Sequence, residues 1–400
     1  MRSIELFAGG GGLALGAHMA GFTTEVVAEW DRWCCDTLRE NQAVGHPLVQ
    51  DIDIREADVR GIDWSVYEGQ IDLVSGGPPC QPFSGGGKGL AHCDPRDMFP
   101  VTANVIRLIR PKAFIVENVR GLTRARFTDY FTYIQLRLSH PELVQRDTET
   151  WAEHFSRLQA EHTSVQDDLR YNVVTTVVNA ADYGVPQQRW RVFMVGFRAD
   201  MDAEWSFPEP THSAEMLRVS QEETGEYWDR HKVAHQHRPM RADGVPATES
   251  RTGTLAWRTI RDAISDLPDP VTRESRVFLN HVLQPGARAY PGHTGSFIDQ
   301  PAKALKAGVH GVPGGENMLR LPDGSVRYFT VREAARLQTF PDRYVLHGPW
   351  TEAMRQLGNA VPVMLAQIVA SSVHEHLALA DLRGRKSAHS LRSAIEKVAA

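Results

Sequence analysis

The chain has 400 residues, of which 42% are hydrophobic and 23% charged, and its formal net charge is −5 at pH 7, so it is a globular chain rather than a disordered or uniformly basic one. Any phosphate-binding surface must therefore be a local patch. No stretch approaches the ~20 continuous apolar residues that span a bilayer, and Met1 leads directly into a strand pattern, so we expect a cytoplasmic protein, neither membrane-bound nor exported.

The first 125 residues alternate between strand and helix patterns. Helical patterns lie at 13–20 and around 36–41. The short apolar runs typical of strands lie at 3–7, 24–28, 71–75 and 113–116. Alternation of this kind predicts a mostly parallel sheet with helices on both faces.

A polar, helix-like insertion follows at 121–170, with helices expected at 130–138 and 151–169. Two further strands are expected at 171–180 and 191–196, and they close the sheet.

The composition changes near residue 198. From 207 to 330 the chain is rich in Pro, Gly and His and lacks long helical periodicity, which indicates a second, loop-rich domain. Helical pattern returns at 331–338 and at 351–376, where a Gly-Asn-Ala-Val-Pro string at 358–362 interrupts it.

A glycine-rich turn follows the first strand. The string Phe7-Ala8-Gly9-Gly10-Gly11-Gly12 opens a helix, where glycines let the backbone approach a ligand and the helix offers free N–H groups. Glu29-Trp30-Asp31 ends the second strand, where a carboxylate can accept both hydroxyls of a ribose. Together the two strings predict a cofactor that contains a nucleoside.

Cys80 lies within Gly-Gly-Pro-Pro-Cys-Gln-Pro-Phe-Ser at 76–84, directly after a buried strand pattern. Pro78 and Pro79 each fix φ, so the turn before the sulfur loses little entropy when it orders. The chain has four cysteines and no C-x-x-C pair, which indicates a reduced protein rather than a disulfide scaffold. A packing cysteine needs no such surroundings, so we interpret Cys80 as a positioned nucleophile.

Charged residues mark the same rim of the predicted sheet. Glu117 follows a strand, and a carboxylic acid with a raised pKa can donate a hydrogen bond to a ring nitrogen. Arg189 and Arg191 lie two apart on a strand and hence on one face, where they can hold a carboxylate, a carbonyl or a phosphate. A salt-bridged surface is the alternative interpretation of the two arginines.

Metal binding finds no support in the sequence. The pair Cys34-Cys35 has no partner at zinc spacing, and His231, His235 and His237 fit a polar loop.

The motifs, taken in order, closely resemble those of the DNA cytosine-5 methyltransferases. The matching strings are F-A-G-G-G-G at 7–12, E-W-D at 29–31, D-V at 58–59, G-G-P-P-C-Q-P-F-S at 76–84, E-N-V at 117–119, Q-R-W-R at 188–191, R-E-A-A-R-L-Q-T-F-P at 332–341 and G-N-A-V-P at 358–362. The segment from about 199 to 325 lacks such strings, and in this family that segment is the target-recognition domain.

The resemblance implies methyl transfer from S-adenosylmethionine to a cytosine that has been flipped out of the duplex. Cys80 would attack C6 and so activate C5, and Glu117 would bind N3 and the exocyclic amine. Arg191 would bind the O2 side of the base, and Arg189 would support Cys80 or a nearby phosphate.

The resemblance also implies a cofactor pocket. Its expected residues are Phe7, Ala8, Gly9, Gly10, Gly12, Glu29, Trp30, Asp58, Val59, Pro78, Met98, Asn359 and Val361. Asp51 and Asp53 are alternatives to Asp58, which the spacing to Cys80 favours.

Two stretches are expected to touch DNA. The glycine-rich stretch that contains Ser84, Gly86 and Lys88 is interpreted as a lid that closes over the flipped base. Lys303, Lys306 and Arg320 are interpreted as phosphate contacts or surface charges rather than base readers.

We therefore expect an α/β protein with a seven-stranded Rossmann-like S-adenosylmethionine-dependent methyltransferase sheet and a smaller loop-rich target-recognition domain. The expected parts are a catalytic and cofactor-binding domain at 1–198, the target-recognition domain at 199–325, a C-terminal segment at 326–380 that returns to the catalytic domain, and a polar tail at 381–400.

The expected partner is double-stranded DNA, bound by a monomer. The short chain resembles a prokaryotic or phage enzyme with a cognate restriction endonuclease as its functional partner. The alternatives are an RNA cytosine-5 methyltransferase and a catalytically silent DNA-binding regulator.

Overall fold

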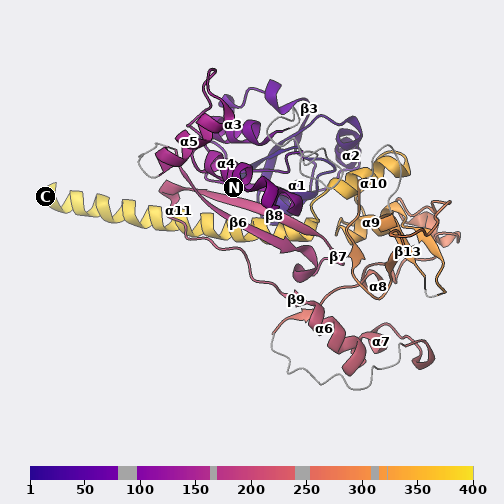
Figure 1. Ribbon diagram of the computed structural model, residues 1–400. Helices are drawn as coiled ribbons and strands as arrows, with labels where there is room; N and C mark the ends of the chain where they lie inside the picture. The colour runs from indigo at the N-terminus through magenta and orange to yellow at the C-terminus, as the bar shows by residue number, and fades with distance from the viewer. Residues whose placement is uncertain (80–96, 163–168, 239–252, 308–314, 322, 400) are drawn as a thin grey trace.

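A seven-stranded sheet lies at the centre of the computed structural model, in which residues 1–79, 97–162, 169–238, 253–307, 315–321 and 323–399 are described, with side chains up to residue 383 (Figure 1). Its order is β3-β2-β1-β4-β5-β8-β6. The strands are β1 (Arg2–Leu6), β2 (Thr23–Glu29), β3 (Asp53–Glu56), β4 (Leu73–Gly76), β5 (Ala113–Val119), β6 (Tyr171–Asn179) and β8 (Trp190–Arg198). The seven-stranded sheet and the α/β class are confirmed.

Five strands are parallel and two are not. β1 to β5 all run the same way, whereas β8 is antiparallel to both β5 and β6. The carboxyl ends of β1 to β5 therefore meet at one edge of the sheet, which we call the carboxyl edge. Ligands of open parallel sheets bind at this edge.

Helices cover both faces of the sheet, as the alternating pattern predicts. On one face, α3 (Phe99–Ile109), α4 (Thr128–Ser139) and α5 (Trp151–His162) pack in a core with apolar residues of β1, β4 and β5. On the other face, α1 (Gly12–Met19) and α11 (Val363–Ala399) pack against the remaining apolar residues of β4, β5 and β8. The helix expected at 151–169 ends at His162, and 163–168 lie outside the described residues.

The last helix is longer than its sequence pattern predicts. The pattern at 351–376 divides into α10 (Trp350–Asn359) and α11, because Pro362 lacks the N–H that a continuous helix needs. α11 runs on to Ala399 and projects from the body, so the expected polar tail is helical (Figure 1). Within the described residues, Trp350–Arg383 is long and apolar enough to cross a membrane by length and composition alone. Its buried residues, such as Leu365 and Val369, belong to the core beside α1.

A third core joins the two ends of the chain. It combines α2 (Arg32–Ala43), α9 (Val331–Leu337) and α10 with Ile260 of α8 (Ile260–Ile264), Ala302 of β12 (Ala302–Lys303) and Leu305. Phe329 and Tyr344 are fully buried in it. Much of the expected target-recognition domain therefore shares its core with the catalytic domain.

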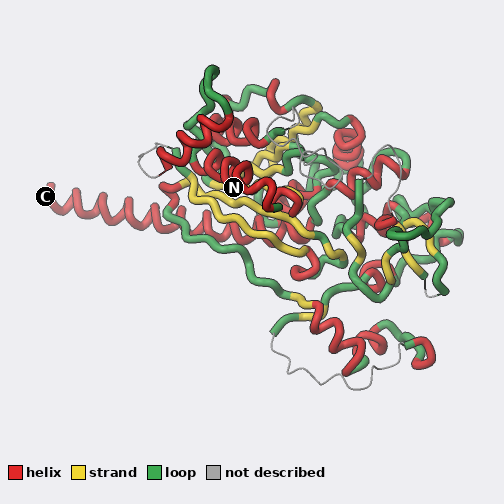
Figure 2. Tube along the Cα trace, in the orientation of Figure 1, coloured by secondary structure: helices red, strands yellow, loops and turns green. Residues whose placement is uncertain are grey.

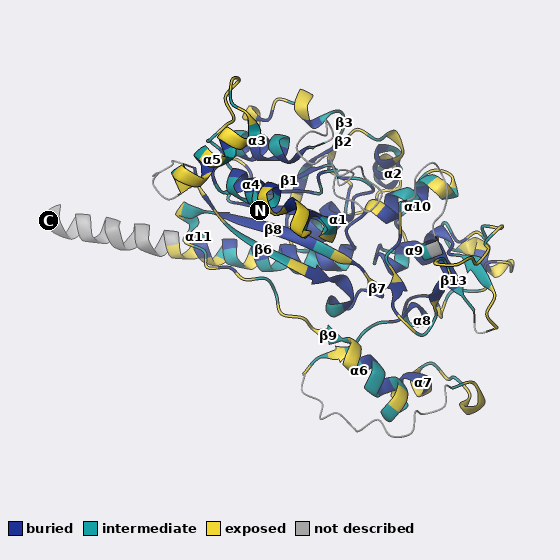
Figure 3. Ribbon diagram, in the orientation of Figure 1, coloured by how far each residue is buried: buried dark blue, intermediate teal, exposed yellow. Residues whose placement is uncertain are grey.

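The remaining part of that domain is a small, separate piece (Figure 2). Helices α6 (Ala214–Arg218) and α7 (Glu226–Arg230) bury only Leu217, Tyr227 and Trp228 in a cluster of their own. Strands β9 (His212–Ser213) and β10 (Leu255–Ala256) pair at its base. Figure 3 shows how much more of this piece is exposed than of the sheet.

Short strands complete the fold. β11 (Ser296–Phe297), β13 (Met318–Arg320) and β14 (Val326–Tyr328) form a three-stranded sheet. β12 pairs with β7 (Gln187–Gln188), a strand that directly precedes Arg189.

Candidate active site

The turn after β4 brings the predicted nucleophile segment to the carboxyl edge. Gly77 lies close to Glu117, because a Cβ there would lie 3.2 Å from Oε2 of Glu117, a tight contact. The Asn118 side-chain amide donates to the carbonyl of Pro78 at 2.9 Å. Cys80 itself lies outside the described residues, but β5 holds the turn that leads to it.

Glu117 and Arg191 form a buried ion pair beside this turn. Nε of Arg191 lies 2.6 Å from Oε1 of Glu117, and their side chains are 11% and 8% exposed. Across the β5–β8 pairing, Glu117 faces Phe193 and Val119 faces Arg191, so the two charged side chains point to the same face. Burial raises the pKa of Glu117, although the positive charges of Arg191 and Arg189 act in the opposite direction. Burial thus favours the protonated carboxyl group, whereas the contact with Arg191 favours the carboxylate.

Arg189 is fully buried between β7 and β8. Its guanidinium donates to the carbonyls of Leu305 at 3.0 Å and Gly358 at 2.6 Å. These carbonyls belong to the predicted recognition region and to the end of α10. Arg189 therefore joins the start of β8 to the segment around Leu305 and to the end of α10. It lies two residues before Arg191 in the sequence.

Gln187 and Gln338 extend this junction. The Gln187 side chain accepts from the Leu305 N–H at 3.0 Å and donates to the Leu337 carbonyl at 3.2 Å. The Gln338 amide donates to the carbonyls of Leu357 and Ala360. Both glutamines are completely buried, so each bond is made without competition from water.

The glycine turn lies at the same edge, between β1 and α1. Phe7, Gly9 and Gly11 have φ values of 55°, 56° and 90° and so adopt the left-handed backbone conformation. Glycine adopts this conformation without steric cost, and two of the three residues are glycines. A Cβ on Gly12 would lie 2.4 Å from the carbonyl oxygen of Val361, so the predicted C-terminal part of the pocket touches the start of α1. Ala8 and Gly10 are buried in the turn.

Glu29 connects the glycine turn to the end of β2. Its carboxylate accepts from the N–H groups of Gly9 at 2.7 Å, Trp30 at 2.9 Å and Asp31 at 2.8 Å. Burial raises the pKa of Glu29, and the three N–H groups act against that shift. Beside it, the Trp30 side chain is 68% exposed, which is unusual for a large apolar group and leaves a face free for stacking.

Asp58 lies nearer to this pocket than its alternatives. β3 pairs with β2 so that Glu56 faces Glu29, and Asp58 follows two residues later at the carboxyl edge. Asp51 and Asp53 lie at or before the start of β3, at the opposite edge. Asp58 accepts from the N–H of Arg60 at 2.9 Å and pairs with its guanidinium, and these bonds lower its pKa.

The other predicted pocket residues are also described. Val59 is buried after β3, Met98 is the residue before α3, and Asn359 is the exposed last residue of α10. All three lie at the ends of elements that reach the carboxyl edge.

The open space at the glycine turn fits a nucleoside-containing cofactor. A Cβ on Gly9 would meet no atom within 4 Å, whereas Gly10, Gly11 and Gly12 are closely surrounded. Gly9 thus faces open space, and its N–H is bonded to the Glu29 carboxylate. The donors and acceptors present match a ribose and an adenine ring.

Glu5 is a buried acid that the sequence motifs do not single out. It lies on β1, accepts a hydrogen bond from the Ser75 hydroxyl on β4, and burial raises its pKa to about 8. A charged residue in the middle of a buried strand is the signal that could have identified it. It lies on the same face as Glu117, whose charge raises its pKa further.

The predicted DNA contacts have different surroundings. Lys306 is tied to Glu316 by an ion pair at 2.6 Å, while Lys303 on β12 is exposed and pairs through its backbone with Gln188. The Arg320 guanidinium stacks over Phe297 at 4.9 Å. Ser84, Gly86 and Lys88 lie outside the described residues.

No metal centre is present among the residues that the structure describes, where no three His, Cys, Asp or Glu side chains gather to hold an ion. Cys34 and Cys35 are buried thiols on α2, and burial raises the pKa of both. His231 instead bonds to Asp262 at 2.9 Å.

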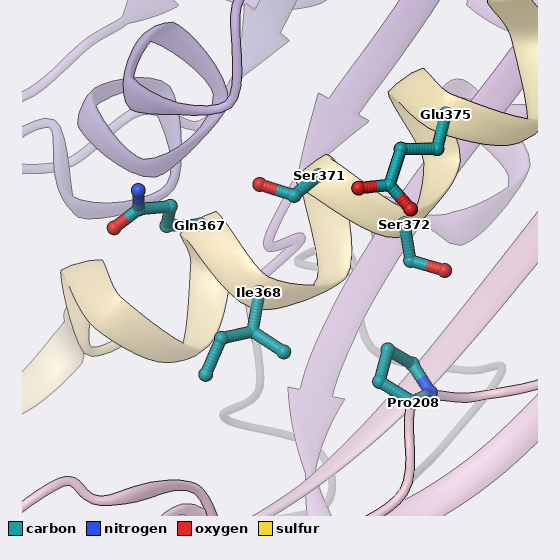
Figure 4. Close-up of a pocket in the computed structure, with 6 residues that line it drawn as sticks. All are labelled: Pro208, Gln367, Ile368, Ser371, Ser372 and Glu375. Carbon is teal, nitrogen blue, oxygen red and sulfur yellow. The ribbon is translucent and has the colours of Figure 1, made fainter.

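A hollow of about 460 Å³ lies elsewhere, on α11 (Figure 4). Its lining residues are Pro208, Gln367, Ile368, Ser371, Ser372 and Glu375. None of them is a predicted site residue, so this hollow is separate from the carboxyl edge.

The family model for the C-5 cytosine-specific DNA methylases matches residues 1–140 and 152–375 of the chain. Among curated proteins, Type II methyltransferase M.NgoMIV of Neisseria gonorrhoeae is 31% identical, over 93% of this chain and 96% of that protein. Type II methyltransferase M.PspPI of Psychrobacter sp. (strain TA137) is 30% identical, over 92% of this chain and 78% of that protein.

Solved structures have the same fold. A DNA modification methyltransferase encoded within a prophage (E. coli) has a TM-score of 0.57 at 20% identity, covering 94% of this chain and 99% of that one. The S. pombe Dnmt2 methyltransferase has a TM-score of 0.53 at 16% identity with the same coverage.

Proposed function

The chain belongs to the C-5 cytosine-specific DNA methylase family and is a DNA methyltransferase that uses S-adenosylmethionine, and we propose that it methylates C5 of a cytosine flipped out of a specific duplex sequence. The observation that carries the proposal is the buried Glu117–Arg191 pair beside the Gly77–Pro78 turn that leads to Cys80. A base inside the duplex cannot reach this pair, so it must be extruded at a cost of a few kcal/mol.

The base-binding step follows from the chemistry of Glu117. As a carboxylic acid, its O–H would donate to N3 of cytosine and its carbonyl oxygen would accept from the exocyclic amine. Burial raises the pKa of Glu117 and so favours the protonated form that this contact needs. Arg191 would then bind O2 of the base.

Bonds change at Cys80 and at the cytosine ring, and S-adenosylmethionine would supply the methyl group and leave as S-adenosylhomocysteine. The Cys80 thiolate adds to C6, which makes C5 nucleophilic, and the cofactor supplies the methyl group that C5 accepts. Loss of the C5 proton to a base then restores the ring and expels the Cys80 sulfur. We assign Arg189 a positioning role, because its guanidinium is bonded to the carbonyls of Leu305 and Gly358.

For the cofactor pocket we propose Glu29 at the ribose and Trp30 stacked on adenine, with Asp58 accepting from the adenine amine. The glycine turn from Phe7 to Gly12 would border the methionine part, and Pro78, Met98, Asn359 and Val361 would complete the walls. The Gly9 N–H holds the Glu29 carboxylate next to the open space at Gly9, where it could accept hydrogen bonds from the ribose hydroxyls.

The biological setting is part of the proposal. Relatives such as M.NgoMIV are called Type II methyltransferases, so we propose that this protein protects host DNA from a cognate restriction endonuclease. It would act as a monomer in the cytoplasm, with residues 199–325 as its target-recognition domain. Two groups of residues would contact the DNA. One is the lid, with Ser84, Gly86 and Lys88, and the other consists of Lys303, Lys306 and Arg320.

The direct test is bisulfite sequencing of plasmid DNA from a methylation-free host that expresses the chain. Cytosines modified at C5 within one short sequence are expected. An unmodified plasmid beside folded protein would overturn the proposal, and methylation of tRNA in the same cells would favour an RNA methyltransferase. Specific DNA binding without any methylation would favour a catalytically silent regulator.

A further inference from the structure

Three exposed arginines gather directly after β5. Arg120 lies in the 3₁₀ turn η4 (Arg120–Thr123), and Arg124 and Arg126 lie at or in the next turn, η5 (Ala125–Phe127). All three side chains are exposed, and none has an ion pair with a residue that the structure describes. Because the whole chain has a net charge of −5, such a group of unpaired cations is a local exception.

Trp190 fixes the position of the first arginine. The Arg120 guanidinium lies 4.9 Å from the centre of the Trp190 ring, a stacking that restricts the arginine while its N–H groups remain available. Trp190 is 43% exposed and is the first residue of β8. Stacking therefore presents a planar cation at the surface with little remaining side-chain freedom.

The stacked pair adjoins the proposed catalytic pair. Nη1 of Arg191 donates to the Trp190 carbonyl at 2.8 Å, and Nε of the same side chain pairs with Glu117. Arg120 follows Glu117 by three residues, which is about 10 Å of extended chain. This length is comparable to the widths of the B-DNA grooves, about 6 to 12 Å, so the Arg120 side chain lies within one groove width of the proposed base-binding pair.

We propose that Arg120, stacked on Trp190, and the neighbouring Arg124 and Arg126 form a binding surface for DNA backbone phosphates next to the flipped cytosine. We call it the Arg120 surface. It rests on the proposed function and adds a contact outside the target-recognition domain. A guanidinium fork matches two phosphate oxygens, and contacts to phosphates set the position of a duplex without reading its sequence.

The test measures binding of a duplex of about 30 base pairs with random sequence, by fluorescence anisotropy at several salt concentrations. Arg120→Ala should weaken binding ~3- to 10-fold and lower the slope of log Kd against log salt by about 0.9, the value for one lost phosphate contact. Arg120→Lys keeps the charge but not the stacked fork, so its slope should stay near that of the wild type while its affinity falls less.

Arg170→Ala is the matched control. Arg170 is also exposed and has no ion pair with a described residue, but it precedes Tyr171, which pairs with Arg198 at the other end of β8 from Trp190. Its salt slope should equal that of the wild type. S-adenosylmethionine affinity and circular dichroism should be unchanged in all variants, which excludes loss of fold.

The two proposals fail in different ways. If the wild type methylates plasmid DNA but Arg120→Ala binds the duplex with the slope of Arg170→Ala, the Arg120 surface is wrong and the proposed function stands. If the wild type methylates no DNA while the slope still depends on Arg120, the proposed function is wrong and the surface is a nucleic-acid contact of another kind.

Discussion

The central sheet and the segment 199–325 are stabilised in different ways. The sheet buries complete strands such as β5 between two layers of helices, and its apolar residues come from every part of the first 200 residues. In the segment 199–325, the piece with α6 and α7 has a cluster of three buried residues, Leu217, Tyr227 and Trp228. The remainder, with Ile260, Ala302 and Leu305, belongs to the core of α2, α9 and α10.

The difference teaches that the recognition segment is not one independent domain. Its second half is bonded to the catalytic body through Arg189, Gln187 and the β7–β12 pair. The piece from about 212 to 257 has the smallest core of its own, and it is joined to the rest by polar contacts, such as those of Tyr227 with Thr259 and Asp299 and of Arg230 and His231 with Asp262. The segment that we propose as the DNA-recognition region is thus anchored to the junction around Arg189.

Cys80→Ala separates chemistry from binding most strongly. Turnover should fall at least ~10⁴-fold, because alanine has no thiol and the thiols of Cys34 and Cys35 are buried with raised pKa values. Duplex affinity should be nearly unchanged, since the recognition segment is intact. Methyl transfer and duplex binding are measured on the same sample, and turnover near the wild-type rate would contradict the mechanism.

The two regions should respond to pH in opposite directions. Burial raises the pKa of Glu5 in the sheet from 4.5 to about 8, so the folded state keeps a proton there that the unfolded state has lost. The free energy of unfolding should therefore fall as pH rises from 4.5 to about 8, by at most ~1.4 kcal/mol per pH unit. Glu5→Gln should remove the part of the slope that Glu5 contributes, while the raised pKa values of Glu29 and Glu117 leave the rest.

Asp262 in α8 is the counterpart of Glu5. Burial acts to raise its pKa, but hydrogen bonds from Thr259 and the charges of Arg230 and His231 lower it below 3.8. Its contribution should be present above its ordinary pKa and lost as pH falls through the lowered value. Urea unfolding from about pH 3 to about pH 8 measures stability against pH for the wild type, Glu5→Gln and Asp262→Asn. The differences from the wild type should change with pH in opposite directions for the two variants, and changes in the same direction would contradict the contrast.

Gly358→Ala tests the anchor between the regions. A Cβ there would lie 2.2 Å from the Ala307 nitrogen and 2.4 Å from the Lys306 carbonyl carbon, both backbone atoms. We expect a loss of about 1–3 kcal/mol in the free energy of unfolding and a lower kcat, because Arg189 bonds to the Gly358 carbonyl. Gly61→Ala, where a Cβ meets nothing within 4 Å, is the control, and equal stability of the two variants would argue against a tight anchor.

Excision of the piece with α6 and α7 should have the smallest effect on the catalytic body. β9 and β10 pair in parallel, with Leu255 beside His212 and Ala256 beside Ser213, so a glycine-serine linker of about a dozen residues, long enough to return along β9, can replace residues 214–254. S-adenosylmethionine affinity should stay within about twofold by calorimetry, because neighbouring units of low stability unfold independently. Target recognition should change or disappear. A variant that fails to fold would assign this piece to the core.

Local patterns predicted the sheet well and its surroundings less well. Apolar runs such as 71–75 and 113–116 are buried strands, because a strand covered on both faces must be apolar along its length. The extent of the expected recognition domain, 199–325, could not be checked from local patterns in this way. The contact that ties Leu305 to the catalytic body is with Arg189, 116 residues away in the sequence. The helical continuation of α11 past residue 380 was missed because its polar composition resembles a tail.

The sequence by itself determined the order of the motifs and with it the family and the cofactor class, and from the same motifs come the roles that we propose for Cys80 and Glu117. Only the tertiary structure decided that Arg191 pairs with Glu117, that Arg189 is buried in a junction and that Arg120 stacks on Trp190. The physical reason is that a motif records which groups the chemistry needs, whereas burial and charge partners depend on distant segments that folding brings together.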